Sequence, residues 1–192
     1  MQRAGWKRCG FVLAAAIALL PVAPAQARRV VYRFDGGTAK QRVEVARALS
    51  AGRFDWSVLP QVVTVHIRAG VLSEARPGEV WLDANLLDAG SFSWGVIQHE
   101  FAHQIDFLLL DDDERASMQR RLGGATWWPV PGRSHESAAA ERFASTLAWA
   151  YWPSARNCMK PTSRSDESGS LPPATFRHLV DALLAAARGD TA

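Results

Sequence analysis

The sequence is poor in cysteine: its 192 residues contain two, Cys9 and Cys158. Cys9 lies in an N-terminal segment that we expect to be removed, which would leave Cys158 alone in the mature chain. A single cysteine cannot form an intramolecular disulfide, and this excludes a small disulfide-stapled scaffold. We expect Cys158 to be a buried thiol or, as the alternative, an intermolecular link.

The chain also lacks an apolar run long enough for a resident membrane span. A basic start, MQRAGWKR, precedes the apolar stretch CGFVLAAAIALLPVA, and Ala25-Gln26-Ala27 supplies the small residues that a signal peptidase requires. The apolar stretch contains Pro21 and is shorter than the roughly 20 residues that cross a bilayer. We therefore interpret residues 1–27 as a secretory signal peptide. The protein is expected to be secreted or extracytoplasmic, with no stable membrane span after cleavage.

An excess of charge of one sign is missing as well. The formal net charge of the full chain is +3, but Arg3, Lys7 and Arg8 belong to the expected signal, and their removal leaves a balance of 0. A neutral chain gives no reason to expect a nucleic-acid partner. The remaining residues, about 165, are enough for one domain with a hydrophobic core.

Local patterns in the first half of the chain predict a small sheet. Three stretches are rich in β-branched and aromatic residues and are typical of strands: 30–34, 62–67 and 79–87. Between the first two, Thr38 and Gln41 predict a capping box for a helix that ends at Gly52. Together with the helices that follow, this pattern predicts an α+β fold with a small, mostly antiparallel sheet.

Helical patterns dominate the second half. Ser91 is a candidate N-cap for a helix that runs to about Leu109. The acidic cluster 111–114 lacks the spaced ligands and interior glycine of a calcium loop. We interpret it as the capped start of a further helix that ends at Gly123.

The last third of the chain contains a loop and two more helices. After the loop, Ser134 is expected to cap a helix over residues 135–152. Residues 160–173 are rich in Ser and Pro, which predicts a linker or surface loop, and the tail predicts an amphipathic helix docked on the domain. The organisation that we predict has four parts: signal peptide 1–27, a folded domain over 28–159, linker 160–173 and C-terminal helix 174–192.

The stretch HEFAHQID (99–106) carries the clearest chemical signal. On a helix, residues four apart project side by side, so His99 and His103 can bind one metal ion through their imidazoles. Glu100 lies about 100° round the helix from His99, beside the ion, where it can take a proton from a zinc-bound water. We expect one Zn²⁺ per chain at this site.

A catalytic zinc site normally has three protein ligands and an open position. A metzincin would place its third histidine where this chain has Leu109, so that class is excluded. The predicted helix after Ser134 offers Glu136 and Glu141, which point about 140° apart and cannot both face one ion. Glu136 is explained by the helix dipole alone, whereas Glu141 lies in an apolar segment where a carboxylate needs a partner. We therefore predict Glu141 as the third ligand.

HEFAHQID, followed roughly forty residues later by AERFASTLAWAYW, resembles the glutamate-type zincins. The likeness is to the Mlc titration factor A peptidases and the lethal-factor-like toxin domains, which have an HEFAH-x-x-D or HEFGH-x-x-D helix and a later glutamate-bearing helix. It covers roughly residues 79–155. The resemblance implies His99, His103 and Glu141 as zinc ligands and Glu100 as general base and proton shuttle.

The resemblance has two further implications. In zincins an edge strand before the motif helix commonly binds the substrate backbone, and residues 79–87 would be that strand here. Those peptidases also often carry a tyrosine seven residues before the third ligand, which stabilises the oxyanion, but this chain has Ser134 there. His135 is either the replacement hydrogen-bond donor or a solvent-exposed histidine at the helix start.

Two other features have alternative roles. Asp106 lies on nearly the same side of the helix as the second histidine. It either orients a ligand histidine by accepting a hydrogen bond from its far nitrogen, or forms a structural ion pair with Arg133 or Arg142. The neighbouring tryptophans, Trp127 and Trp128, either wall a substrate cleft or pack in the core.

These residues predict a secreted zinc metallopeptidase that hydrolyses peptide or protein substrates with zinc-activated water, Glu100 passing the proton to the leaving amine. Two alternatives stay open: a non-catalytic, zinc-stabilised binding domain, and an amidase acting on cell-wall peptide. Glu100 favours an enzyme over a binding domain, because a purely structural site has no use for a carboxylate beside an open metal position.

Overall fold

The protein has an α+β fold built on a four-stranded mixed sheet. The computed structural model describes residues 31–187, and the predicted signal peptide lies outside them. The strands lie in the order β1-β2-β4-β3. Their bounds are β1 (Tyr32–Gly36), β2 (Val63–Arg68), β3 (Glu74–Arg76) and β4 (Glu79–Asp83).

The sheet is mostly parallel, and our prediction of a mostly antiparallel sheet was wrong. β1 pairs with β2, and β2 with β4, in parallel; β3 alone of these four strands runs antiparallel, against β4. Helix α1 (Ala39–Ala51) supplies the crossover between β1 and β2. β3 carries the chain back along the sheet, so that β4 can enter beside β2 in the same direction. The strand predicted at 79–87 ends at Asp83, which caps the short helix α2 (Ala84–Leu87).

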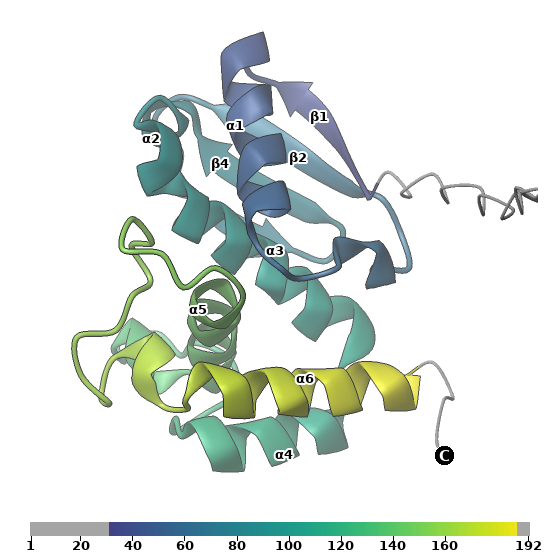
Figure 1. The fold of residues 1–192 in the computed structure, drawn as a ribbon, viewed down its shortest axis with the longest axis vertical. Coiled ribbons are helices and arrows are strands. Elements are labelled where there is room, and N and C mark those ends of the chain that lie inside the picture. The colour runs from purple at the N-terminus through teal and green to yellow at the C-terminus, as the bar shows by residue number, and fades with distance from the viewer. Residues whose placement is uncertain (1–30, 188–192) are drawn as a thin grey trace, which may run out of the picture.

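Four further long helices lie in the second half of the described chain. They are α3 (Trp94–Leu109), α4 (Asp112–Leu122), α5 (Ala139–Tyr151) and α6 (Pro173–Ala187). In Figure 1, α1 crosses one face of the sheet, α4, α5 and α6 gather at the other end of the molecule, and α3 runs between the two groups. α3 packs against α1, β3 and α5.

Two of the predicted helices begin and end at the predicted residues. Thr38 and Gln41 form the capping box of α1, and Gly52 follows its last residue. Asp111 and Glu114 form a second capping box at α4, and Gly123, with a φ of 79°, ends that helix. In both cases short polar side chains satisfy backbone N–H groups that have no partner inside the helix.

Two other helix starts differ from the predictions. α3 begins after a 3₁₀ turn, η2 (Gly90–Ser93), and not at Ser91. α5 begins after a second 3₁₀ turn, η3 (His135–Ser137), and Ser134 makes no side-chain capping bond. Glu141 consequently lies in the first turn of α5, close to the positive end of the helix dipole.

α3 is buried on nearly all sides, so its polar residues also need partners. Gln104 accepts a hydrogen bond from the Gly78 N–H (2.8 Å) and donates to the carbonyls of Arg76 (2.9 Å) and Glu79 (3.1 Å). These three bonds join the β3–β4 turn to the motif helix. They fix how far the edge of the sheet lies from the histidines.

The C-terminal part of the described chain covers α5. α6 packs against α5, with Phe176, Val180 and Leu184 buried. The loop before α6 contains η4 (Glu167–Gly169), which also packs against α5. Among residues 31–187 no helix combines the length and the apolar character needed to cross a membrane.

Cys158 is an exposed free thiol, so our expectation of a buried one was wrong. It follows α5 in a loop where the neighbouring Asn157 is buried instead and donates its side-chain amide to the Ala148 and Trp152 carbonyls.

Candidate metal centre

The motif residues form a buried cluster on α3. His99, Glu100 and His103 each offer a ligand atom within 4.8 Å of the others, and all three residues are buried. The Nε2 atoms of His99 and His103 lie 3.1 Å apart, as the four-residue spacing on a helix allows.

Glu141 joins this cluster from α5. Its Oε2 atom lies 3.2 Å from His99 Nε2 and 3.3 Å from His103 Nε2. The approach of the two helices is close because α5 presents alanines to its neighbours, and four of them are fully buried: Ala139, Ala140, Ala144 and Ala148. Glu136 lies in η3 and is exposed, so Glu141 is the glutamate that the fold brings to the histidines.

The three donor atoms fit a tetrahedral metal ion. Their separations of 3.1, 3.2 and 3.3 Å form a nearly regular triangle. A tetrahedral zinc ion with ligands at about 2.0–2.1 Å has its ligand atoms about 3.3 Å apart. Two imidazole nitrogens and a carboxylate oxygen are also a donor set that zinc accepts, so this group can hold a metal ion.

The electrostatics of the cluster keep Glu141 charged. Burial opposes ionisation of its carboxyl, but hydrogen bonds and charge from His103 and His99 outweigh burial and hold the pKa well below its usual range. Glu100 has the opposite balance. Burial raises the pKa of its carboxyl, although the neighbouring His99 and His103 act to lower it. A carboxylate with a raised pKa is a stronger proton acceptor.

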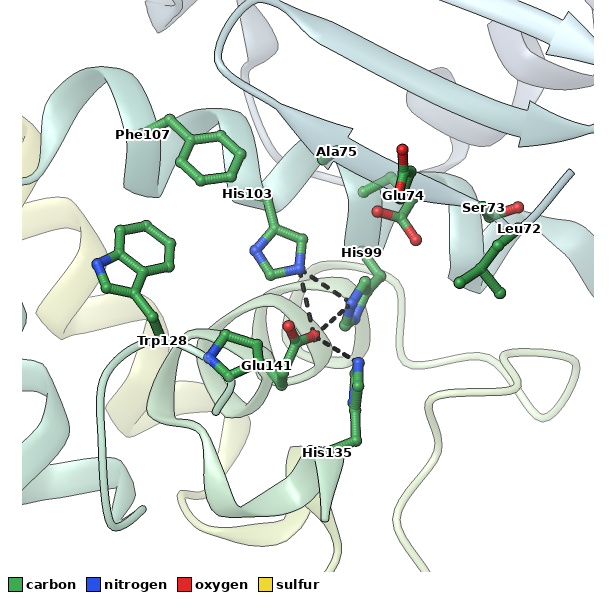
Figure 2. Close-up of a pocket in the computed structure, with 12 residues that line it drawn as sticks. Leu72, Ser73, Glu74, Ala75, His99, His103, Phe107, Trp128, His135 and Glu141 are labelled. Atoms are coloured by element: carbon green, nitrogen blue, oxygen red, sulfur yellow. Dashed lines mark hydrogen bonds and ion pairs between the residues drawn. The ribbon is translucent and has the colours of Figure 1, made fainter. Parts of the chain in front are cut away.

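His135, from η3, completes a ring of imidazoles around Glu141 (Figure 2). Its Nε2 atom lies 3.1 Å from Glu141 Oε2, and its Nδ1 atom lies 2.7 Å from Glu167 Oε1. The side chain is 61 % exposed, in contrast to the buried histidines of α3. The hydrogen bond to Glu167 raises the pKa of His135 despite partial burial.

The Asp106 carboxylate binds side chains outside the ring of imidazoles. Its Oδ1 atom accepts hydrogen bonds from Arg115 Nε (3.0 Å) and Trp127 Nε1 (3.0 Å), and burial raises the pKa of its carboxyl. Of the two roles that the sequence allowed, the structure shows an ion pair, but with Arg115 and not with Arg133 or Arg142. Among the described residues, neither Asp106 Oδ2 nor His103 Nδ1 has a hydrogen-bond partner.

A cavity of about 240 Å³ opens over the cluster. In Figure 2, residues 72–75 lie on one side of the histidines, and Phe107 and Trp128 on the other. The two tryptophans differ in role. Trp127 is buried and packs in the core, whereas Trp128 is 42 % exposed and lines the cavity. The strand beside the cavity is β3 and not the expected 79–87, since β4 lies inside the sheet.

The sequence motifs did not predict two side chains that contact the histidines. Ser145, on α5, lies 3.0 Å from His99 Nδ1, and Glu167 binds both Ser145 and His135. Glu167 lies in the Ser- and Pro-rich segment that predicted a linker. The polar composition of this segment does not predict which way a single carboxylate in it points.

No family model matches the chain, and no curated protein or solved structure is significantly similar to it. The resemblance to glutamate-type zincins therefore rests on the sequence motifs, and the structure shows a buried group of His99, Glu100 and His103 on α3 with Glu141 on a later helix.

Proposed function

We propose that the chain is a secreted zinc-dependent metallopeptidase of the glutamate-zincin kind. One observation carries the proposal: side chains from two helices place three donor atoms at the spacing of a tetrahedral zinc site, with a buried glutamate beside them. His99, His103 and Glu141 would hold the ion. These three ligands leave one coordination position for solvent or substrate, as in catalytic zinc sites.

When bound, zinc supplies Lewis acidity, which lowers the pKa of water and polarises a carbonyl oxygen. Glu100 then acts as general base, because its raised pKa suits it to accept a proton from the attacking water. After the attack, the protonated Glu100 delivers the proton to the leaving amine. His135 in its protonated form, which the hydrogen bond to Glu167 favours, donates a hydrogen bond from Nε2 to the carbonyl oxygen as negative charge develops there.

The edge of the sheet offers a place for the substrate backbone. β3 is a terminal strand of the sheet, and edge strands can pair with an extended peptide through backbone hydrogen bonds. Residues 73–75 line the same cavity as Glu100 and the histidines. An extended chain paired with β3 would therefore pass directly over the proposed zinc site.

The test is to measure zinc content and cleavage in the purified protein and in Glu100→Gln. We expect one zinc ion per chain in both, and a kcat lower by about 10²- to 10⁴-fold in the variant. Glu136→Gln makes the same change on an exposed side chain of η3 and should alter neither quantity. Full activity in Glu100→Gln would overturn the proposed mechanism. The substrates should include cell-wall peptides, since an amidase would use the same residues.

The position of His135 supports a second candidate function, a zinc-stabilised binding domain without catalysis. Because its Nε2 lies 3.1 Å from Glu141 Oε2, His135 is close enough to become a fourth ligand. Four protein ligands would close the site, as in structural zinc sites. Its 61 % exposure favours the open site instead, because the ligands of a closed site are normally held in the interior.

A further inference from the structure

Glu167 contacts two of the histidines around the proposed zinc site, one directly and one through a serine. Its Oε1 atom lies 2.7 Å from His135 Nδ1. Its Oε2 atom accepts a hydrogen bond from Ser145 Oγ at 2.8 Å, and Ser145 Oγ lies 3.0 Å from His99 Nδ1. One carboxylate from the loop 160–173 is thus linked to both α5 and α3.

The hydrogen-bond directions follow from the chemistry of the three groups. A serine hydroxyl has one proton, and the carboxylate of Glu167 is a far better acceptor than the Met159 sulfur, 3.6 Å from the same hydroxyl. Ser145 therefore donates to Glu167 and accepts from His99. The neutral His99 that zinc binding requires must then carry its remaining proton on Nδ1, which leaves the lone pair of Nε2 for the metal ion.

The loop is held so that Glu167 points inward. Asp166 accepts four hydrogen bonds, from the backbone N–H and hydroxyl groups of Thr162 and Ser163. Thr146, on α5, donates to the Glu167 carbonyl (3.3 Å), and Arg142 donates to the Ser165 carbonyl (3.2 Å). The loop is therefore fixed on the same helix that carries Glu141.

We propose that Glu167 is a positioning residue for the metal centre, which orients His99 through Ser145 and His135 directly. The proposal rests on the proposed zinc site. Histidine ligands commonly donate their second ring nitrogen to a carboxylate, which fixes the tautomer and the ring orientation. Here the carboxylate comes from a surface loop, and a serine relays its effect to the more distant ring.

The test is the zinc dissociation constant of four proteins, measured by competition with a chelator: wild type, Glu167→Ala, Ser145→Ala and the double variant. Each single variant should bind zinc about 10- to 100-fold more weakly. Because Glu167 acts on His99 through Ser145, the double variant should be no weaker than Glu167→Ala alone. Losses that multiply would show two independent roles and overturn the relay.

Two controls separate positioning from loop structure. Thr146→Val removes a bond that holds the loop backbone but keeps the carboxylate and Ser145, so zinc affinity should change little. Glu136→Ala removes an exposed glutamate beside His135 and should leave affinity unchanged. If the Glu167→Ala and Ser145→Ala variants bind zinc like the wild type, this inference fails and the proposed function stands. If the wild type binds no zinc, the proposed function fails and this inference with it.

Discussion

The carboxylate of Glu141 lies 3.2 Å from the Nε2 atom of His99, although 42 residues separate the two in sequence. One residue is in the first turn of α5 and the other is in the middle of α3, so their distance depends on how the two helices pack. Buried alanines on α5 permit this packing. The site is therefore a product of the fold, and changes to the packing of α3 and α5 are expected to affect metal binding.

His135→Ala separates the two roles open to this histidine. As a hydrogen-bond donor to the substrate oxygen, its loss should lower kcat by roughly 10²-fold and leave the zinc dissociation constant nearly unchanged. If His135 is instead the fourth ligand of a closed, non-catalytic site, its loss would strongly weaken zinc binding. There would then be no catalytic activity to lose. We expect the first result, measured by steady-state kinetics and chelator competition on the same preparation.

Asp106→Ala should destabilise the fold by about 3–5 kcal/mol, because Asp106 is fully buried and its loss leaves Arg115 and Trp127 without their acceptor. Asp112→Ala is the matched control, since Asp112 binds the same arginine but is fully exposed. Its effect should stay within about 0.5 kcal/mol. Urea denaturation of the zinc-free protein measures both, and equal effects would contradict this assignment.

The stability of the zinc-free protein and the stabilisation that zinc adds should respond to pH in opposite directions. Burial alone would lower the pKa of His103, but the hydrogen bond and charge of Glu141, with Glu100 and Asp106, raise it above 6.5. A raised folded-state pKa stabilises the zinc-free protein below the unfolded pKa, and this stability is lost as pH rises through the folded value.

Zinc requires the deprotonated ring, so zinc binding strengthens over the same rise in pH. The Tm of the zinc-free protein should therefore fall between about pH 6 and about pH 8, while the increase in Tm caused by zinc should grow. Thermal melts with and without zinc at several pH values test this. A zinc-induced increase that is constant over that range would contradict the prediction.

Trp128→Ala should raise KM for peptides with a large apolar side chain near the cleaved bond, by roughly 2- to 10-fold, with less effect on kcat. Trp128 lines the cavity and stacks on Phe107, with ring centroids 5.5 Å apart. Phe92→Ala is the control, because Phe92 is a large exposed aromatic that does not line this cavity. Equal changes of KM in the Trp128→Ala and Phe92→Ala variants would show that the Trp128 side chain has no specific role in substrate binding.

Local chemistry made much of the helical structure predictable from the sequence. The capping residues of α1 and α4 are short-range signals, and those helices begin and end where the signals lie. The histidine pair was predictable for the same reason, since four-residue spacing alone sets it on one face of a helix. For α5, the polar segment before Glu141 resembled a helix start, but it forms a separate 3₁₀ turn.

Long-range pairing was less predictable. β3 has the sequence Glu-Ala-Arg, with no β-branched or aromatic residue, so it gave no strand signal. Because β3 was missed, so was the reversal of the chain that makes β4 parallel to β2, and the sheet was predicted with the wrong strand direction. Glu167 was missed because its role depends on where a polar loop folds back, and hydrogen bonds accepted by Asp166 and donated by Thr146 determine that position.

The most direct test of this account is a crystal of the protein soaked with zinc and measured at the zinc absorption edge. We predict one anomalous peak at about 2.0–2.1 Å from His99 Nε2, His103 Nε2 and a carboxylate oxygen of Glu141. A zinc peak elsewhere, or no peak between α3 and α5, would contradict the central claim that these three side chains hold one ion.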